Sequence, residues 1–60
     1  MEKYNAVAFS NNHQICQLQS KEYDDKIEEF IKKNERKGYK VVVDLLTNKK
    51  IERQVYKTKN

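Results

Sequence analysis

The sequence is poor in the residues that usually reinforce a small domain. It has no proline or tryptophan, and only one glycine, one cysteine and one histidine. Because Cys16 is alone, no internal disulfide can form, and one Cys with one His offers few metal ligands. A domain of 60 residues buries only about 60% of the surface that its unfolded chain exposes. We therefore expect a partner chain, or very regular local structure, to supply the missing stability.

Long apolar runs are also absent. The longest, residues 41–46, is interrupted by Asp44 and is far shorter than the roughly 20 residues that cross a bilayer. The first five residues lack the basic region and apolar core of a secretory signal. Together with the single cysteine, these features predict a soluble protein of the reducing cytoplasm.

The sequence offers no recognisable catalytic arrangement. Gly38 is the only glycine, so no glycine-rich phosphate loop exists. His13 and Cys16 are three residues apart on a predicted strand and should point to opposite faces, which separates nucleophile from base. Cys16 is expected to be a small buried or half-buried hydrophobe. We predict a non-enzyme with no catalytic residues, no metal, no cofactor and no small-molecule substrate.

One acidic cluster raises the question of a divalent cation. Its members lie at i, i+4 spacing on a predicted helix and are Asp24, Asp25, Glu28 and Glu29. Neighbouring lysines supply partners of opposite sign, which is the ordinary pattern of a solvated helix face. The cluster also lacks the number of ligands that calcium requires.

Local patterns predict the first three elements. Residues 3–10 and 13–18 form a β-hairpin, because Asn11-Asn12 tolerates the left-handed conformation of a tight turn. A helix over 21–36 follows, with Ser20 as N-cap and apolar residues repeating on one face. Gly38 stands where a left-handed residue ends a helix.

The rest of the chain predicts a second hairpin. Residues 39–46 and 51–57 are strands joined by a turn at 47–50, and residues 58–60 form a fraying tail. The element order is β-β-α-β-β, so we predict one α+β domain over residues 1–60. Its small antiparallel sheet has one helix packed on one face.

Charge sets the predicted register of the second hairpin. A loop centred on Asn48-Lys49 places Leu46 opposite Ile51, Asp44 opposite Arg53, and Val42 opposite Val55. Slipping the register would instead oppose Asp44 to Glu52. The favoured register collects six residues on one sheet face: Val42, Asp44, Leu46, Ile51, Arg53 and Val55. The opposite face then carries Val41, Val43, Leu45 and Tyr56.

A single helix covers only one of these two apolar faces. Continuous apolar runs are typical of strands buried on both sides, and an uncovered apolar patch marks an interaction site. We therefore predict that the six-residue face binds protein, either a second copy or another partner. The alternative is that terminal residues fold over the face, or that a few exposed valines are simply tolerated.

Charge is distributed unevenly along the chain. Residues 1–31 carry three basic and six acidic side chains, whereas residues 32–60 carry ten basic and three acidic ones. The predicted topology gathers a basic pole at one end of the sheet, made of Lys32, Lys33, Arg36, Lys37, Lys40, Lys57 and Lys59. Such a pole suits phosphates or an acidic protein surface, and Tyr39 and Tyr56 could stack on bases. The alternative is complementation of the helix dipole together with solubility.

Composition points to a source class and a function class. Richness in Lys, Asn and Ile fits an AT-rich genome, where small chains of this kind are often phage or mobile-element products that modulate a host protein. We predict a non-catalytic regulatory or inhibitory protein that binds a host protein and forms a homodimer through the exposed sheet face. The alternative is a small nucleic-acid-binding protein that uses the basic pole.

Overall fold

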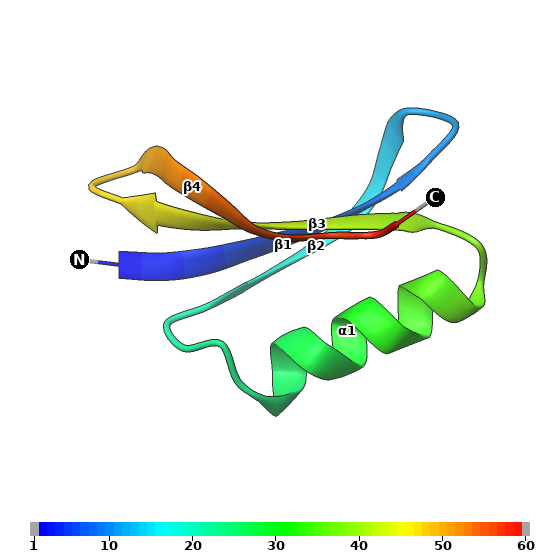
Figure 1. Cartoon of the computed structure of the whole chain (residues 1–60), viewed down its shortest axis with the longest axis horizontal. Helices are drawn as coiled ribbons and strands as arrows, with labels where there is room; N and C mark the ends of the chain where they lie inside the picture. Colours follow the sequence, from blue (N-terminus) through cyan, green and yellow to red (C-terminus); the bar gives the residue numbers. More distant parts are fainter. Residues whose placement is uncertain (1, 60) are drawn as a thin grey trace.

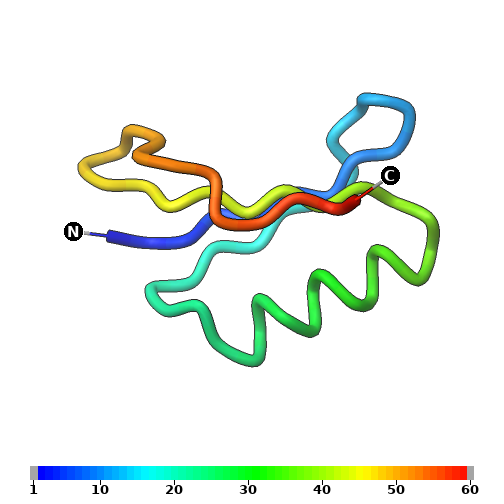
Figure 2. Tube along the Cα trace, in the orientation of Figure 1, coloured from blue at the N-terminus to red at the C-terminus, as the bar shows by residue number. Residues whose placement is uncertain are grey.

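A computed structural model describes residues 2–59 of the chain. It contains a four-stranded antiparallel sheet in the order β2-β1-β3-β4, with one helix between β2 and β3. The elements are β1 (Glu2–Ser10), β2 (His13–Ser20), α1 (Asp25–Arg36), β3 (Lys40–Thr47) and β4 (Lys50–Lys57). The helix lies on one face of the sheet (Figure 1), and the trace follows the predicted β-β-α-β-β order (Figure 2). The predicted α+β fold is confirmed.

The core lies between α1 and the three strands that it contacts, which are β1, β2 and β3. Ile27 and Ile31 of the helix pack against small and β-branched side chains of the sheet. Those partners are Ala6, Ala8, Val41 and Val43, each fully buried. The alanines of β1 let the helix approach the central strand closely, while the valines of β3 fill the space beside it. The helix makes no comparable contact with β4.

Both hairpins turn through two residues in the left-handed conformation. Asn11 and Asn12 have φ of 52° and 68°, and Asn48 and Lys49 have φ of 53° and 68°. Two successive positive φ values define the type I′ turn, whose twist matches that of the flanking strands. The predicted position of each turn is confirmed.

Lys49 is the least suited of these four residues to its conformation. A side chain in the left-handed region costs about 1–2 kcal/mol, and asparagine is better tolerated there than lysine. We expect Lys49→Gly to raise the free energy of unfolding by about 1 kcal/mol, measured by urea denaturation. The matched control is Lys50→Gly, which should destabilise because Lys50 belongs to β4. If Lys49→Gly proved destabilising, the turn would not be type I′.

The helix begins later than the sequence predicts. Its N-cap is Asp24, which has an extended backbone and accepts a hydrogen bond from the Lys26 N–H at 3.1 Å. Ser20, the predicted cap, instead accepts from the Glu22 N–H at 3.3 Å. The prediction of a start at residue 21 is therefore wrong, because Ser20 stabilises a separate turn. Tyr23 is left before the helix, 40% exposed, where its ring packs edge-on against Tyr4.

The helix ends as predicted, at a glycine. Gly38 has φ of 88°. The N–H of Gly38 donates to the Glu35 carbonyl and that of Tyr39 donates to the Asn34 carbonyl, both at 3.0 Å. This pair of bonds is the Schellman motif, which satisfies carbonyls that the helix leaves free.

Residues after β4 are held in place up to Thr58. The Thr58 N–H donates to the Val41 carbonyl at 2.9 Å, and its hydroxyl accepts from the Val41 N–H at 2.8 Å. The predicted fraying at residue 58 is therefore wrong, because the threonine side chain extends the β3–β4 pairing by one residue. Asn60 lies outside the described residues.

The predicted register of the second hairpin is correct only beside its turn. Leu46 pairs with Ile51, but Asp44 pairs with Gln54 and Val42 pairs with Lys57. Two shifts in register, between Val43 and Asp44 and between Leu45 and Leu46, produce the difference. Each β-bulge adds a residue to β4 and increases its local twist. A simple alternation of faces along β4 therefore fails.

No helix among residues 2–59 is long and apolar enough to pass through a membrane.

Candidate protein-binding face

The sheet face opposite α1 is called the open face here, because the helix packs only on the other side (Figure 1). Both hairpin tips bend away from the helix, so the open face lies between them (Figure 1). Successive residues along a strand point to opposite faces of the sheet, and residues paired across two strands point to the same face. Since Ala6 and Val43 face the helix, their neighbours Val7 and Val42, which pair with each other, lie on the open face.

One half of the open face is a network of side-chain amides. Asn5 Oδ1 accepts from Gln17 Nε2 at 3.1 Å and from Gln19 Nε2 at 3.2 Å. Gln17 Oε1 in turn accepts from Gln14 Nε2, and Gln19 Oε1 from Lys3 Nζ, each at 3.1 Å. These bonds link five side chains of β1 and β2. The network leaves this half of the face polar and ordered.

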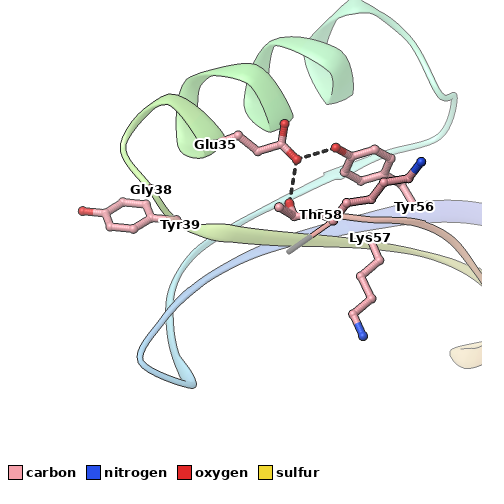
Figure 3. A pocket seen from close by; sticks show the side chains of 7 residues that line it. Glu35, Gly38, Tyr39, Tyr56, Lys57 and Thr58 are labelled. Carbon is pink, nitrogen blue, oxygen red and sulfur yellow. Dashed lines mark hydrogen bonds between the residues drawn. The ribbon is translucent and has the colours of Figure 1, made fainter.

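An apolar cluster lies beside the amide network. Val7 is 8% exposed, while Val42 and Phe9 are half-buried. Lys40, paired with Phe9, and Lys57, paired with Val42, flank the cluster. Figure 3 shows Lys57 pointing away from the helix side. We call Val7, Phe9, Val42, Lys40 and Lys57 the Phe9 cluster.

The Phe9 cluster contains a shallow depression of about 280 Å³. Its lining residues are Phe9, Asn12, Lys40, Val42 and Lys57. An apolar floor with ammonium groups at the rim suits a ligand that is both apolar and negatively charged. This depression is the candidate site on the open face.

A second apolar pair lies near the other end of the face. Leu46 is half-buried and Ile51 is 65% exposed. Between this pair and the Phe9 cluster runs a polar row of paired residues, in which Asn5 pairs with Gln19 and Asp44, and Asp44 with Gln54. The polar row divides the apolar residues of the face into two parts, and Asp44 lies in that row beside Gln54, not beside the predicted Arg53.

Four of the six predicted interface residues lie on the open face: Val42, Asp44, Leu46 and Ile51. Arg53 does not oppose Asp44 but pairs with Leu45, whose side chain is buried on the helix side. Val55 packs against the core cluster beside Tyr56. For these two residues the predicted placement is wrong, because the bulges in β4 shift them off the expected face.

The residues of the predicted basic pole gather at one end of the molecule but face different directions. Lys32, Lys33 and Arg36 border a shallow depression on the helix together with Glu29. Lys40 and Lys57 belong to the open face, whereas Lys59 borders a depression beside Tyr39 and Tyr56. Lys37 is the C-cap residue of the helix. The pole is thus spread over three surfaces, and only Lys40 and Lys57 flank an apolar cluster.

A hydrogen-bonded cluster at the helix side closes this end of the core (Figure 3). Glu35 Oε2 accepts from the Tyr56 hydroxyl and, at 2.6 Å, from the Thr58 hydroxyl. The hydrogen bond from Thr58, and then that from Tyr56, lowers the pKa of the Glu35 carboxyl. The same contact with Glu35 is the main cause that raises the pKa of Tyr56. This cluster joins β4 to the helix, which otherwise leaves that strand uncovered.

Acid should weaken the Glu35 cluster. Because the pKa of the Glu35 carboxyl is lower in the folded chain, its contribution to stability is complete above the ordinary value of 4.5 and is lost as pH falls through the folded pKa. We expect Glu35→Gln to reduce the loss of stability between neutral pH and pH values below 4.5, measured by thermal melts across pH. Glu29→Gln, on the exposed part of the helix, is the matched control and should leave the acid sensitivity unchanged. Equal profiles for wild type and Glu35→Gln would contradict the assignment.

Cys16 is exposed, and its thiol donates to Asn34 Oδ1 at 3.6 Å. The expectation that Cys16 is buried or half-buried is therefore wrong, because β2 is an edge strand. Among residues 2–59, no group of three or more His, Cys, Asp or Glu side chains is arranged to hold a metal ion.

Sequence reasoning missed Val7, Phe9 and the amide network. The alternation of Gln14, Gln17 and Gln19 with apolar residues on β2 is visible in the sequence, but a bulge at Ile15 changes which of them share a face.

Comparison with family models, curated proteins and solved structures finds no match for this chain.

Proposed function

We propose that this chain is a non-catalytic regulatory or inhibitory protein that binds another protein through the open face of its sheet. The observation that carries the proposal is the Phe9 cluster, where an apolar floor is flanked by Lys40 and Lys57 on a face that no other described element covers. A host protein modulated by a small phage or mobile-element product would fit this mode of action.

The charge of the open face indicates the chemical character of the partner's surface. Lys3, Lys40 and Lys57 lie on the open face, and Asp44 is the one acidic residue among its paired positions. A partner with an apolar patch rimmed by carboxylates complements both features. A second copy laid on the same face would bring like charges together, so we assign this face to a different, acidic protein.

The test uses a defined probe, an amphipathic peptide of alternating Glu and Leu. Amide chemical shifts of the labelled protein should change at Val7, Phe9 and Val42, and Val42→Lys should abolish the changes. The matched control is Glu29→Gln, which makes the same +1 change of charge at an exposed position of the helix. Shift changes confined to residues outside the open face would refute the proposal. A doubling of mass that Val42→Lys removes would instead identify a second copy as the occupant.

A nucleic-acid partner is the second candidate, favoured by one observation. Phe9 is an aromatic ring that lines the same depression as two lysines, Lys40 and Lys57. This arrangement allows a base to stack while phosphates bind the ammonium groups. Tyr39 lies near the same end, beside Lys59.

An oligothymidylate distinguishes the two candidates. Nucleic-acid binding predicts affinity for this probe that falls steeply with salt and is lost in Phe9→Leu, which keeps the apolar contact but removes the ring. Protein binding predicts that Phe9→Leu retains most of its affinity for the acidic peptide. Failure of the oligonucleotide to bind at low salt would exclude the second candidate.

A further inference from the structure

The two edges of the sheet differ in their protection against pairing. The outer strand β4 carries Lys50, Glu52, Arg53 and Lys57 and has two register shifts. The other outer strand, β2, runs for eight residues with the sequence HQICQLQS and has no Lys, Arg, Asp, Glu or Pro. Charges and bulges are the devices by which natural sheets prevent edge-to-edge association. Beyond the single bulge at Ile15, β2 has none of them.

We propose that β2 pairs antiparallel with β2 of a second copy, about a twofold axis at Leu18, so that the two sheets become one continuous sheet. This inference does not depend on the proposed function, because it concerns the backbone edge of β2 and not the Phe9 cluster. The occupant is a second copy because β2 carries no Lys, Arg, Asp or Glu. Two chains that each have a net charge of +4 can therefore meet at this edge without placing like charges opposite each other.

The register follows from the pairing of β1 with β2. A two-residue turn closes on a hydrogen-bonded pair, here Ser10 and His13. Hydrogen-bonded pairs alternate with non-hydrogen-bonded pairs along an antiparallel ladder. The backbone N–H and C=O groups of Ala8 and Ala6 therefore also point toward β2. Gln17 and Gln19, which lie on either side of Leu18, therefore direct their backbone N–H and C=O groups outward.

With a twofold axis at Leu18, the outward N–H and C=O groups of each copy bond to those of the other copy. The axis places Gln17 of one copy opposite Gln19 of the other, twice, in the straight part of β2 beyond the bulge. The side chains are already fixed, since both amides donate one N–H to Asn5, and each keeps a second N–H for its counterpart. On the helix side, the half-buried Leu18 packs against Leu18 of the second copy, and this contact shields both side chains from water.

The decisive experiment changes the charge of the two facing positions. Gln17→Lys with Gln19→Lys opposes lysine to lysine twice, whereas Gln17→Lys with Gln19→Glu opposes lysine to glutamate twice. We expect sedimentation equilibrium over a concentration series to show a dimer for the wild type, a monomer for the Lys/Lys variant and a dimer again for the Lys/Glu variant. Circular dichroism checks that each variant remains folded.

A crosslink provides an independent measurement. Side chains related by the axis occupy a non-hydrogen-bonded pair with Cα atoms about 4.5 Å apart, which is within the range of a disulfide. Leu18→Cys in a Cys16→Ser background should therefore form a covalent dimer on oxidation, and Arg53→Cys in the same background, on the other edge, should not.

Two results would overturn the proposal. One is a wild-type chain that stays monomeric at every concentration. The other is identical association of the Lys/Lys and Lys/Glu variants, which would place the contact elsewhere. No partner protein enters these measurements, so failure of edge pairing and failure of the open face as a binding site are separate outcomes. Val42→Lys should leave the dimer intact.

Discussion

Replacing Ile27 by alanine should remove a large share of the protein's stability. Ile27 is fully buried and is the most enclosed residue of α1. Removing a buried isoleucine side chain costs about 2–5 kcal/mol. A domain of this length has a total stability of roughly 3–9 kcal/mol, at about 0.05–0.15 kcal/mol per residue. One truncation therefore removes between about a fifth of the stability and all of it, depending on where the protein lies in these ranges.

Urea denaturation measures this effect directly. Glu28→Ala, the next residue along the helix and exposed, is the matched control and should change stability by no more than about 0.5 kcal/mol. The comparison tests the placement of the helix, on which the identity of the open face rests. A loss below about 1 kcal/mol for Ile27→Ala would show that the helix does not rest on the sheet through this residue.

Reversing both charges beside Phe9 should weaken binding of the acidic Glu-Leu peptide by about a hundredfold. Lys40 and Lys57 flank Phe9 and Val42, and Lys40→Glu with Lys57→Glu replaces two attractions by two repulsions. Like charges brought together at an interface cost several kcal/mol, and a hundredfold loss corresponds to about 3 kcal/mol. Isothermal titration with wild type and variant measures the difference.

The matched control carries the same change of charge on another surface. Lys32→Glu with Lys33→Glu alters the depression on the helix and leaves the open face intact. We expect this variant to lose only the long-range attraction, which added salt removes from the wild type as well. Equal losses in the two variants would mean that net charge, and not the Phe9 cluster, governs binding.

The fold was predictable because each element has a local cause. Asn11, Asn12 and Asn48 tolerate the left-handed conformation that their turns require, and Gly38 ends the helix for the same reason. Apolar periodicity predicted one buried face of the helix, and the structure buries Ile27 and Ile31 on that face. None of these features depends on distant residues, so a reading of the sequence alone could find them.

The site was less predictable because it depends on bulges. The extra residues at Ile15 and in β4 change which side chains share a face, and no local signal in the sequence specifies them. The β4 bulges allow Val55 and Tyr56 to pack against the core together, a long-range preference that outweighs regular alternation. Likewise Ser20 and Asp24 are both good caps, and the choice between them is made by the turn that joins β2 to the helix.

The strand order also determines how the molecule responds to tension. β1 begins at one end of the sheet and β4 finishes at the other (Figure 1), because the two strands are parallel, with β3 antiparallel between them. A force applied through Glu2 and Thr58 therefore pulls along the strands. Under this force, the backbone hydrogen bonds that join β3 to β1 and to β4 must break together. A force applied across the strands would break them one at a time. This geometry makes a chain of marginal thermodynamic stability resistant to stretching along that axis.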